Sequence, residues 1–569
     1  MDKRFFLALM LTGAVVIVTP MLFPRAPIAT PPAATVATQA TTGQAPTTAP
    51  NTSTSPTVPS AVGASVVRAG TPPAPAIVEE TLTVANELLR LSLSTQGAAL
   101  VTAGLPRYRQ LSDAAGEVVL ANVGAPMLHY RLIAGGDTIA LDTVAFAAVR
   151  GTVEGRESVT LTGALGAARV EVKYTLAPDN YLAEVSWRAD GIAQPAFLLT
   201  DLPSGFLSQE KDTTEDYRHL AYAMKPTRSG ADRVDFRKPD PGERILQPGP
   251  LAWVVAKNKY FLVGVLAAEG AASSPFAEVQ VMGAARVNKV AVNAHATVVA
   301  PLPAGGIAFE LYAGPQEWER LVGMGREFEN VNPYGGFISG VVQPFATIVM
   351  RVLLWMKRTL QIEYGWILVI FGVVIRLAMW PLNSRMMRSS IQMQRIAPQV
   401  QAAQNKHKGD AEKQREAVMK VYAEAGVSPF AALSGCLPML LPMPILFALF
   451  FVFQNTIEFR GVSFLWLADI SLKDPFYILP IAMGLSMFVL SWVGMRNVPP
   501  NPQTKMMAYL MPVVMTVALL NFASGLNLYY AVQNLAALPQ QWLIANERSK
   551  IAPVTAVAAA PSGGEKKKR

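Results

Sequence analysis

Residues 364–381 read YGWILVIFGVVIRLAMWP, and this stretch decides how the rest of the chain is interpreted. It is apolar enough to be a membrane-spanning helix except for Arg376, whose charge inside a span costs roughly 2.5–3.5 kcal/mol on insertion scales. Two interpretations follow. Arg376 lies near the helix end, so it can extend its charge to the membrane surface. Alternatively, it faces a polar groove inside a helix bundle, which is the interpretation that the remaining sequence favours.

The composition excludes several classes of protein. The chain has 569 residues, of which 51% are hydrophobic, and a net charge of +9, which is too apolar for an ordinary soluble enzyme. Its single cysteine, Cys436, excludes an intramolecular disulfide and a cysteine-based zinc site. The four histidines show no metal-ligand spacing, so we expect no metal and no cofactor; they are His129, His219, His295 and His407.

The N-terminal region has the pattern of an export signal. Residues 1–24 carry Lys3 and Arg4 before an apolar run, which predicts a transmembrane signal-anchor with a cytoplasmic N-terminus; a cleaved signal peptide is the alternative. Residues 25–76 are rich in Ala, Thr and Pro and have almost no charge. Such a segment buries too little apolar surface to order itself, so we predict a disordered linker.

Residues 77–330 have the alternation of apolar and polar residues that is typical of strands. Examples are residues 88–94, 138–149, 158–162 and 168–176, and turn residues separate them. Strands at this spacing predict a large periplasmic β-sandwich. We interpret it as a scaffold or docking domain. The alternative, a membrane-tethered sugar-active enzyme, would require a pair of catalytic carboxylates that we do not find in the sequence.

The C-terminal region predicts a bundle of membrane helices. Residues 331–362 contain an amphipathic interfacial helix whose apolar face consists of Phe345, Ile348, Val349, Val352, Leu353 and Met356. Residues 363–545 hold the Arg376 span and apolar segments at 437–453, 476–493, 506–522 and 526–544. Together with the N-terminal anchor these make six spans, so the fold class is a multi-pass α-helical membrane protein with a five-helix core.

The distribution of basic residues gives the expected topology. The loop 383–426 and the tail 546–569 are rich in Lys and Arg, which places both, and both chain termini, in the cytoplasm. The loop predicts a hairpin of two helices, 386–404 and 411–425, the first bent or broken at Pro398. The loop is either a solvated segment that sets topology or a docking arm for a ribosome or nascent chain, and the tail could bind anionic lipid or ribosomal RNA.

Four stretches, taken together, resemble the YidC/Oxa/Alb family of membrane protein insertases. They are VIR at 374–376 with PL at 381–382, GCLP at 435–438 with PMPI at 442–445, DPFYILPI at 474–481, and MP at 511–512 with SGLNLYYAVQN at 524–534. The resemblance covers about residues 344–544 strongly. It implies a bacterial inner-membrane protein of the Gram-negative type, which inserts nascent membrane proteins alone or with the Sec translocon and contacts membrane lipids.

The resemblance also implies a substrate-binding groove that is open to the cytoplasm and to lipid. Arg376 would be its fixed cation and would attract the acidic tail of an incoming membrane protein. Polar residues of the last spans fit its wall, although each could equally form ordinary interhelical hydrogen bonds; they are Asn527, Tyr529, Tyr530, Gln533 and Asn534. A transporter of an anionic solute is the remaining alternative, and it would require an internal repeat that we do not observe.

Overall fold

The structure is a computed structural model that describes residues 79–112, 116–122, 124–271, 274–287, 291–332, 339–407, 410–426, 443–496 and 502–549. The predicted signal-anchor (1–24) and linker (25–76) lie outside these residues. So do residues 550–569 of the predicted tail and residues 427–442, which include the beginning of the predicted span 437–453.

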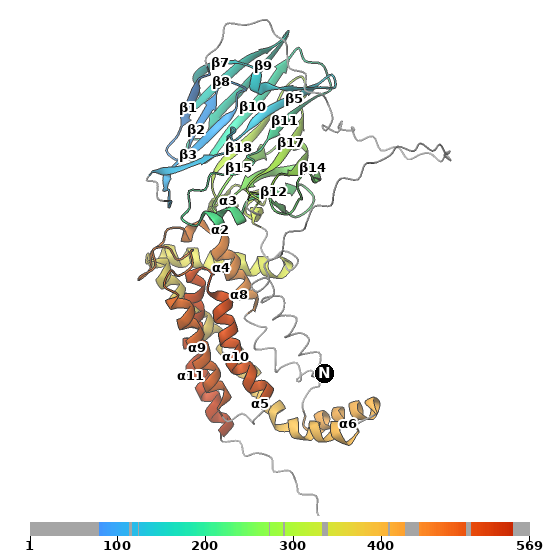
Figure 1. The fold of residues 1–569 in the computed structure, drawn as a ribbon, viewed down its shortest axis with the longest axis vertical. Coiled ribbons are helices and arrows are strands. Elements are labelled where there is room, and N and C mark those ends of the chain that lie inside the picture. The colour runs from blue at the N-terminus through green and yellow to red at the C-terminus, as the bar shows by residue number, and fades with distance from the viewer. Residues whose placement is uncertain are drawn as a thin grey trace, which may run out of the picture. The chain divides into compact units, whose positions relative to one another are not determined.

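The first part of the described chain forms two antiparallel sheets (Figure 1). The smaller sheet has the order β1 (Thr81–Ala85), β2 (Arg90–Ser94), β3 (Leu100–Arg109), β4 (Glu117–Ala121). The larger sheet has the order β6 (Asp137–Ala140), β5 (His129–Ala134), β11 (Ala196–Asp201), β17 (Ala294–Pro301), β16 (Phe276–Gly283), β14 (Arg244–Lys257), β15 (Phe261–Ala267), β18 (Ile307–Pro315), β10 (Leu182–Asp190), β9 (Ala168–Leu176), β8 (Arg156–Leu165), β7 (Phe146–Val153). Strand β12 (Ala221–Pro226) pairs with β13 (Asp232–Asp235) and with β14.

This part confirms the predicted β-sandwich. In β9 every second side chain is buried, as in Val170, Val172 and Tyr174, which is the period of a strand with one face in a core. The buried side chains of both sheets form one continuous apolar cluster. Its largest members include Trp187, whose ring lies 4.7 Å from that of Tyr130. Short helices connect the strands: η1 (Leu141–Thr143), α2 (Thr213–Arg218), α3 (Trp318–Gly323) and η2 (Phe328–Val331).

One strand prediction was wrong. Residues 138–149 form two strands, β6 and β7, separated by η1, and these two strands lie at opposite edges of the larger sheet. The residues of η1 include Leu141, which is buried, so the alternation of apolar residues continues through the turn. A pattern of period two therefore could not reveal where the chain leaves one edge for the other.

The second part of the described chain is helical. Its helices are α4 (Ser339–Leu360), α5 (Tyr364–Lys406), α6 (Ala411–Glu424), α8 (Met443–Asn455), α9 (Ile478–Met495), α10 (Pro502–Leu519) and α11 (Ser524–Ser549), with the single turn η5 (Ile457–Phe459) between α8 and α9. Helix α11 packs against α9 and α5, and α10 packs against α9 (Figure 1). A Cβ atom at Gly484 of α9 would lie 1.9 Å from Oγ1 of Thr516 in α10, so the close approach of these helices requires glycine.

Helix α4 is amphipathic as predicted, but its apolar side chains occupy two faces. Val349, Leu353 and Met356 are buried against neighbouring helices, whereas Phe345 and Ile348 are 39% and 57% exposed. The prediction placed all of these on one face. Packing against α8 buries one apolar face of α4 and leaves the other exposed. An exposed apolar face suits a helix whose outer surface contacts lipid.

Helix α5 corrects the predicted boundary at the end of the Arg376 span. The sequence predicted that the span ends near Pro381 and that a separate helix, bent at Pro398, begins at residue 386; instead one helix runs through both prolines to Lys406. Each proline removes one backbone N–H donor, which a long helix packed against a neighbour tolerates.

The predicted hairpin is present as the end of α5 and α6. Gln414 Nε2 donates to the carbonyl oxygen of Gln404 across it at 3.0 Å. No residue of α6 is fully buried, and its apolar stripe is half-buried; the stripe consists of Ala417, Val418, Val421 and Tyr422.

Two described helical segments are long and apolar enough to cross a membrane, Tyr364–Arg385 and Ile478–Met495. Two shorter apolar helices are Ile445–Asn455 and Lys505–Leu519. Six spans are therefore not established by the described residues. The 18 residues of α9 would extend about 27 Å, close to the hydrocarbon thickness of a bilayer.

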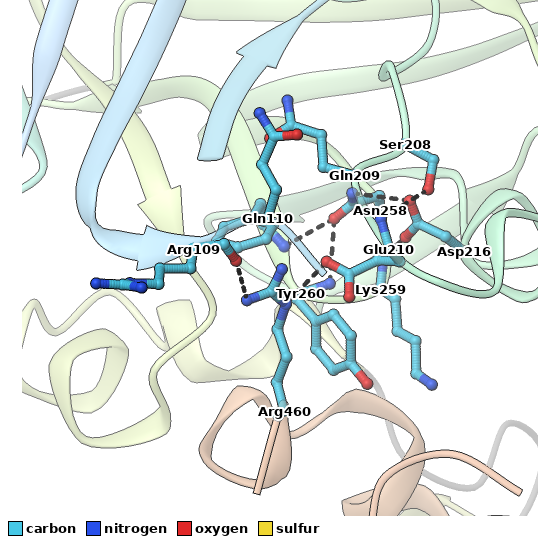
Figure 2. A network of polar contacts seen from close by, with 12 residues as sticks. Arg109, Gln110, Ser208, Gln209, Glu210, Asp216, Asn258, Lys259, Tyr260 and Arg460 are labelled. Atoms are coloured by element: carbon cyan, nitrogen blue, oxygen red, sulfur yellow. Dashed lines mark hydrogen bonds and ion pairs between the residues drawn. The ribbon is translucent and has the colours of Figure 1, made fainter. Parts of the chain in front are cut away.

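A network of polar contacts joins the β-sandwich to the loop between α8 and α9 (Figure 2). Arg460 donates through Nε to Oε1 of Glu210 at 2.8 Å and through Nη1 to the carbonyl oxygen of Arg109 at 3.0 Å. Tyr260 and Ser471 exchange a hydroxyl hydrogen bond at 2.8 Å. Both side chains of the Arg460–Glu210 pair are nearly inaccessible to solvent, so the pair lies inside a packed junction.

Candidate functional site

The predicted groove residues lie where α5 and α11 pack against each other. On α5, Gly372, Arg376, Trp380 and Ser384 are spaced four apart, so they share one face of the helix. Gln533 and Gln540 of α11 bond to all four, through the side chains of Arg376 and Ser384 and through the backbone carbonyl oxygens of Gly372 and Trp380. This face of α5 is therefore joined to α11 by polar contacts.

Arg376 is half-buried and is held by an amide. Its Nη2 donates to Oε1 of Gln540 at 2.9 Å, while its buried Nε has no hydrogen-bond partner in the part of the chain that the structure describes. Among the described residues, no carboxylate lies within 4.0 Å of the guanidinium group. The charge is consequently positioned by a neutral group, and part of its hydrogen-bonding capacity is unused.

Gln540 orients Arg376 because its own amide is fixed from the other side. Its side chain is 2% exposed, and its Nε2 donates to the carbonyl oxygen of Trp380 at 3.0 Å and to Oγ of Ser384 at 2.8 Å. These two donations assign the amide nitrogen, which leaves Oε1 directed at Arg376. Gln540 and Ser384 were missed by the sequence analysis, although Gln540 lies seven residues after Gln533 and so on the same helix face.

Tyr529 and Gln533 form the adjoining part of this face. Gln533 Nε2 lies 2.8 Å from the Tyr529 hydroxyl oxygen and 3.3 Å from the carbonyl oxygen of Gly372 on α5. The Tyr529 ring packs at 5.9 Å from that of Phe371. Arg376, Tyr529 and Gln533 are therefore brought together between the same two helices.

The other three predicted residues do not join this face. Asn534 donates to Oγ of Ser486 on α9 at 3.1 Å. Asn527 is fully buried and donates to the carbonyl oxygen of Leu519, at the end of α10, at 3.1 Å. The Tyr530 hydroxyl is buried and has no hydrogen-bond partner among the described residues. Asn534 and Asn527 thus make interhelical hydrogen bonds, which was the alternative interpretation for all of these residues.

The chemistry available on the α5–α11 face is that of a positioned cation in an apolar surrounding. In such a site a passing carboxylate would interact with Arg376 more strongly than in water, because the local dielectric is lower. Within the described part of the chain, no group of three or more His, Cys, Asp or Glu side chains could hold a metal ion.

Two protein families match the chain. Residues 81–348 match the YidC periplasmic domain, and residues 355–551 match the family described as 60Kd inner membrane protein. The first match covers the β-sandwich and the beginning of α4, and the second includes the α5–α11 face.

Relatives match along most of the chain. The membrane protein insertase YidC of Anaeromyxobacter dehalogenans is 31% identical over 490 residues, covering 82% of this chain and 85% of the relative. That of Chlorobaculum tepidum is 26% identical over 524 residues, covering 86% of each. A solved structure, described as an active YidC insertase with its first transmembrane domain resolved, is 19% identical and covers 82% of this chain and 93% of the other, with a TM-score of 0.32.

Proposed function

The chain belongs to the YidC family of membrane protein insertases, and we infer that it inserts integral membrane proteins and assists their folding. It is an inner-membrane protein with a periplasmic domain, as its two family matches describe. The inferred clients are nascent membrane proteins, which it handles alone or beside the Sec translocon. The six-span topology with cytoplasmic termini, and contacts with a ribosome and with lipids, belong to the same proposal.

The observation that supports a mechanism is the pairing of Arg376 with an amide rather than a carboxylate. A polar tail that must cross the membrane is costly to desolvate, and a fixed cation partway across would offset part of that cost for an acidic tail. The neutral Gln540 leaves the cation free to exchange partners, so the tail is held only transiently. The apolar segment of the client then moves into lipid, which stabilises it by about 25 cal/mol per Å² of buried apolar surface.

The test is insertion of a single-span client with an acidic exported tail into liposomes that contain the purified full chain and no nucleotide. We expect wild type and Arg376→Lys to insert the client and Arg376→Ala to lose at least about tenfold in rate, since about 1.4 kcal/mol of attraction is removed. Arg385→Ala is the matched control, because Arg385 lies on the same helix, is exposed and has no ion-pair partner among the described residues.

The same client with its tail carboxylates changed to amides separates the mechanism from general damage. Its insertion should depend little on Arg376. Equal losses for the acidic and the neutral tail in Arg376→Ala would contradict the role of the charge. No insertion by the wild type, together with flux of an anionic solute, would favour the transporter instead.

A further inference from the structure

A cavity of ≈ 550 Å³ lies where the β-sandwich meets the helical part. Its walls come from α2, from the turn before β15, from the ends of α8 and α10, and from the segment leading to α9. This volume is in the range of cavities that bind small organic ligands. None of the residues of the α5–α11 face lines it.

The charged side chains that line the cavity carry more positive than negative charge. They are Arg218, Lys259 and Lys473, with Asp212 and Glu215. Arg218 is paired with Glu215 at 3.1 Å, and the carboxylate of Asp212 accepts the backbone N–H of Glu215 at 3.0 Å. Among the described residues, Lys259 and Lys473 have no carboxylate within 4.0 Å. The lining therefore has an excess of one positive charge, and its two cations without an ion pair are both lysines.

Lys259 is held in place by its surroundings. Its backbone N–H donates to Oδ1 of Asp216 at 3.2 Å, and the next residue, Tyr260, bonds to Ser471 across the junction. The residue is only 4% exposed, and in Figure 2 its side chain extends away from the carboxylates of Glu210 and Asp216. Its Nζ lies 5.0 Å from the centre of the Tyr260 ring, which stabilises part of the charge, and an anion in the cavity would add the ion pair that this buried ammonium group lacks among the described residues.

Another part of the cavity wall is apolar and aromatic. It includes Phe450 and Phe453 of α8 and Phe522, which follows α10; the rings of Phe450 and Phe522 lie 5.2 Å apart. Outside the cavity, α10 carries exposed apolar side chains on one helix face, at 43%, 58% and 48% exposure for Leu510, Val513 and Val517. A ligand that fits the charged and the aromatic residues has an anionic end and an apolar end.

We propose that this cavity binds the headgroup of an anionic glycerophospholipid, with its phosphate at Lys259 and Lys473 and its acyl chains against Phe522 and the exposed face of α10. A free phosphate ion would satisfy the lysines but not the aromatic wall. A lipid bound here would contact both the β-sandwich and the helices, so it would stabilise the junction between them. This inference does not depend on the insertion mechanism.

Native mass spectrometry of the full chain, delipidated in detergent and titrated with phosphatidylglycerol, tests the proposal. We expect Lys473→Gln to weaken the tightest binding roughly fivefold and Lys259→Gln/Lys473→Gln to weaken it roughly 25-fold, at about 1 kcal/mol for each lysine. Lys473→Arg should bind as the wild type does. Lys473 is exposed, so its variants report binding even if Lys259→Gln impairs folding.

Arg150→Gln/Lys238→Gln is the matched control, because it removes two exposed charges of the β-sandwich that do not line the cavity. Phosphatidylethanolamine should bind more weakly than phosphatidylglycerol, and an excess of inorganic phosphate or of an acidic peptide should not displace the lipid. An equal loss in the control pair would overturn the site in favour of general surface attraction. Displacement by phosphate or by the peptide would assign the cavity to a free ion or to a client tail instead.

Discussion

Two arginines show how differently the two regions of this molecule treat a buried positive charge. Arg460, at the junction, has a carboxylate at 2.8 Å and a backbone carbonyl at 3.0 Å, and its guanidinium carbon lies 5.4 Å from the ring centre of Phe261. Arg376, between α5 and α11, has one amide oxygen at 2.9 Å. The first charge is neutralised inside the protein, and the second is oriented without being neutralised.

The difference indicates what each charge can do. A buried ion pair holds a geometry, because separating its members exposes both to an unfavourable surrounding. A cation inside a membrane region without a carboxylate is costly to keep, and such groups are typically functional. Arg460 thus holds the junction together, whereas the contact of Arg376 with a client is our proposal, and three predictions test this division.

The largest effect is expected at the junction. Arg460→Ala leaves Glu210 buried without its partner and should lower the free energy of unfolding by about 3–5 kcal/mol at pH 8. At this pH Glu210 is ionised in the wild type, because burial raises the pKa of its carboxyl to about 7 while Arg460 opposes the increase. Without Arg460 this pKa rises further, so proton binding by Glu210 moves the loss toward the lower end of that range. Thermal unfolding followed by the circular dichroism of the strands measures the change.

Two further variants sharpen that result. Arg460→Met/Glu210→Leu removes both charges and should be more stable than either single variant, since neither charge is left alone. Arg358→Ala is the control, because its pair with Glu319 is exposed and should contribute only about 0–1 kcal/mol. If Arg460→Ala unfolds like Arg358→Ala, the junction is not held by this pair.

Glu458, also at the junction, should give a smaller and pH-dependent effect. Its Oε1 accepts the backbone N–H of Trp318 at 3.1 Å, whereas its buried Oε2 has no hydrogen-bond partner. Burial raises the pKa of this carboxyl to about 7, and the nearby carboxylates of Glu317 and Glu319 add to the increase.

Because the folded-state pKa lies above the unfolded value of 4.5, proton binding stabilises the fold fully below pH 4.5, and this contribution is lost as the pH rises through 7. We expect Glu458→Gln and the wild type to be about equally stable at pH 5 and the variant to be about 2 kcal/mol more stable at pH 8. Parallel stability curves for the two proteins between pH 5 and pH 8 would show that Glu458 is not the titrating group.

The smallest effect is expected for Gln540→Glu, which gives Arg376 a carboxylate partner such as Arg460 has. It replaces an amide by a carboxylate of the same shape beside Nη2, so Arg376 gains a permanent partner. Insertion of the acidic-tailed client should fall severalfold, by about 1 kcal/mol in activation free energy, while thermal stability stays level or rises. Gln401→Glu is the matched control, because it makes the same change at an exposed position of α5 that lies 25 residues after Arg376. If Gln540→Glu inserts the client as fast as the wild type does, insertion does not require that Arg376 lack a carboxylate partner.

Much of the architecture could be predicted because it depends on short-range patterns. Alternating residues such as Val170, Val172 and Tyr174 predict a strand with one buried face, and the structure confirms it. The apolar run around Arg376 predicts a spanning helix, and α5 begins at Tyr364, as the pattern indicates. The end of that helix could not be predicted from Pro381, because packing against α11 compensates for a missing backbone hydrogen bond.

The sequence by itself determined that a positive charge lies within an apolar helix and that a strand-rich domain precedes it, because both are properties of neighbouring residues. Only the tertiary structure decided which polar groups meet that charge. Gln540 lies 164 residues after Arg376, and Glu210 lies 250 residues before Arg460. Such partners are selected by how helices and sheets pack, so nothing local to either arginine distinguishes the neutralised charge from the free one.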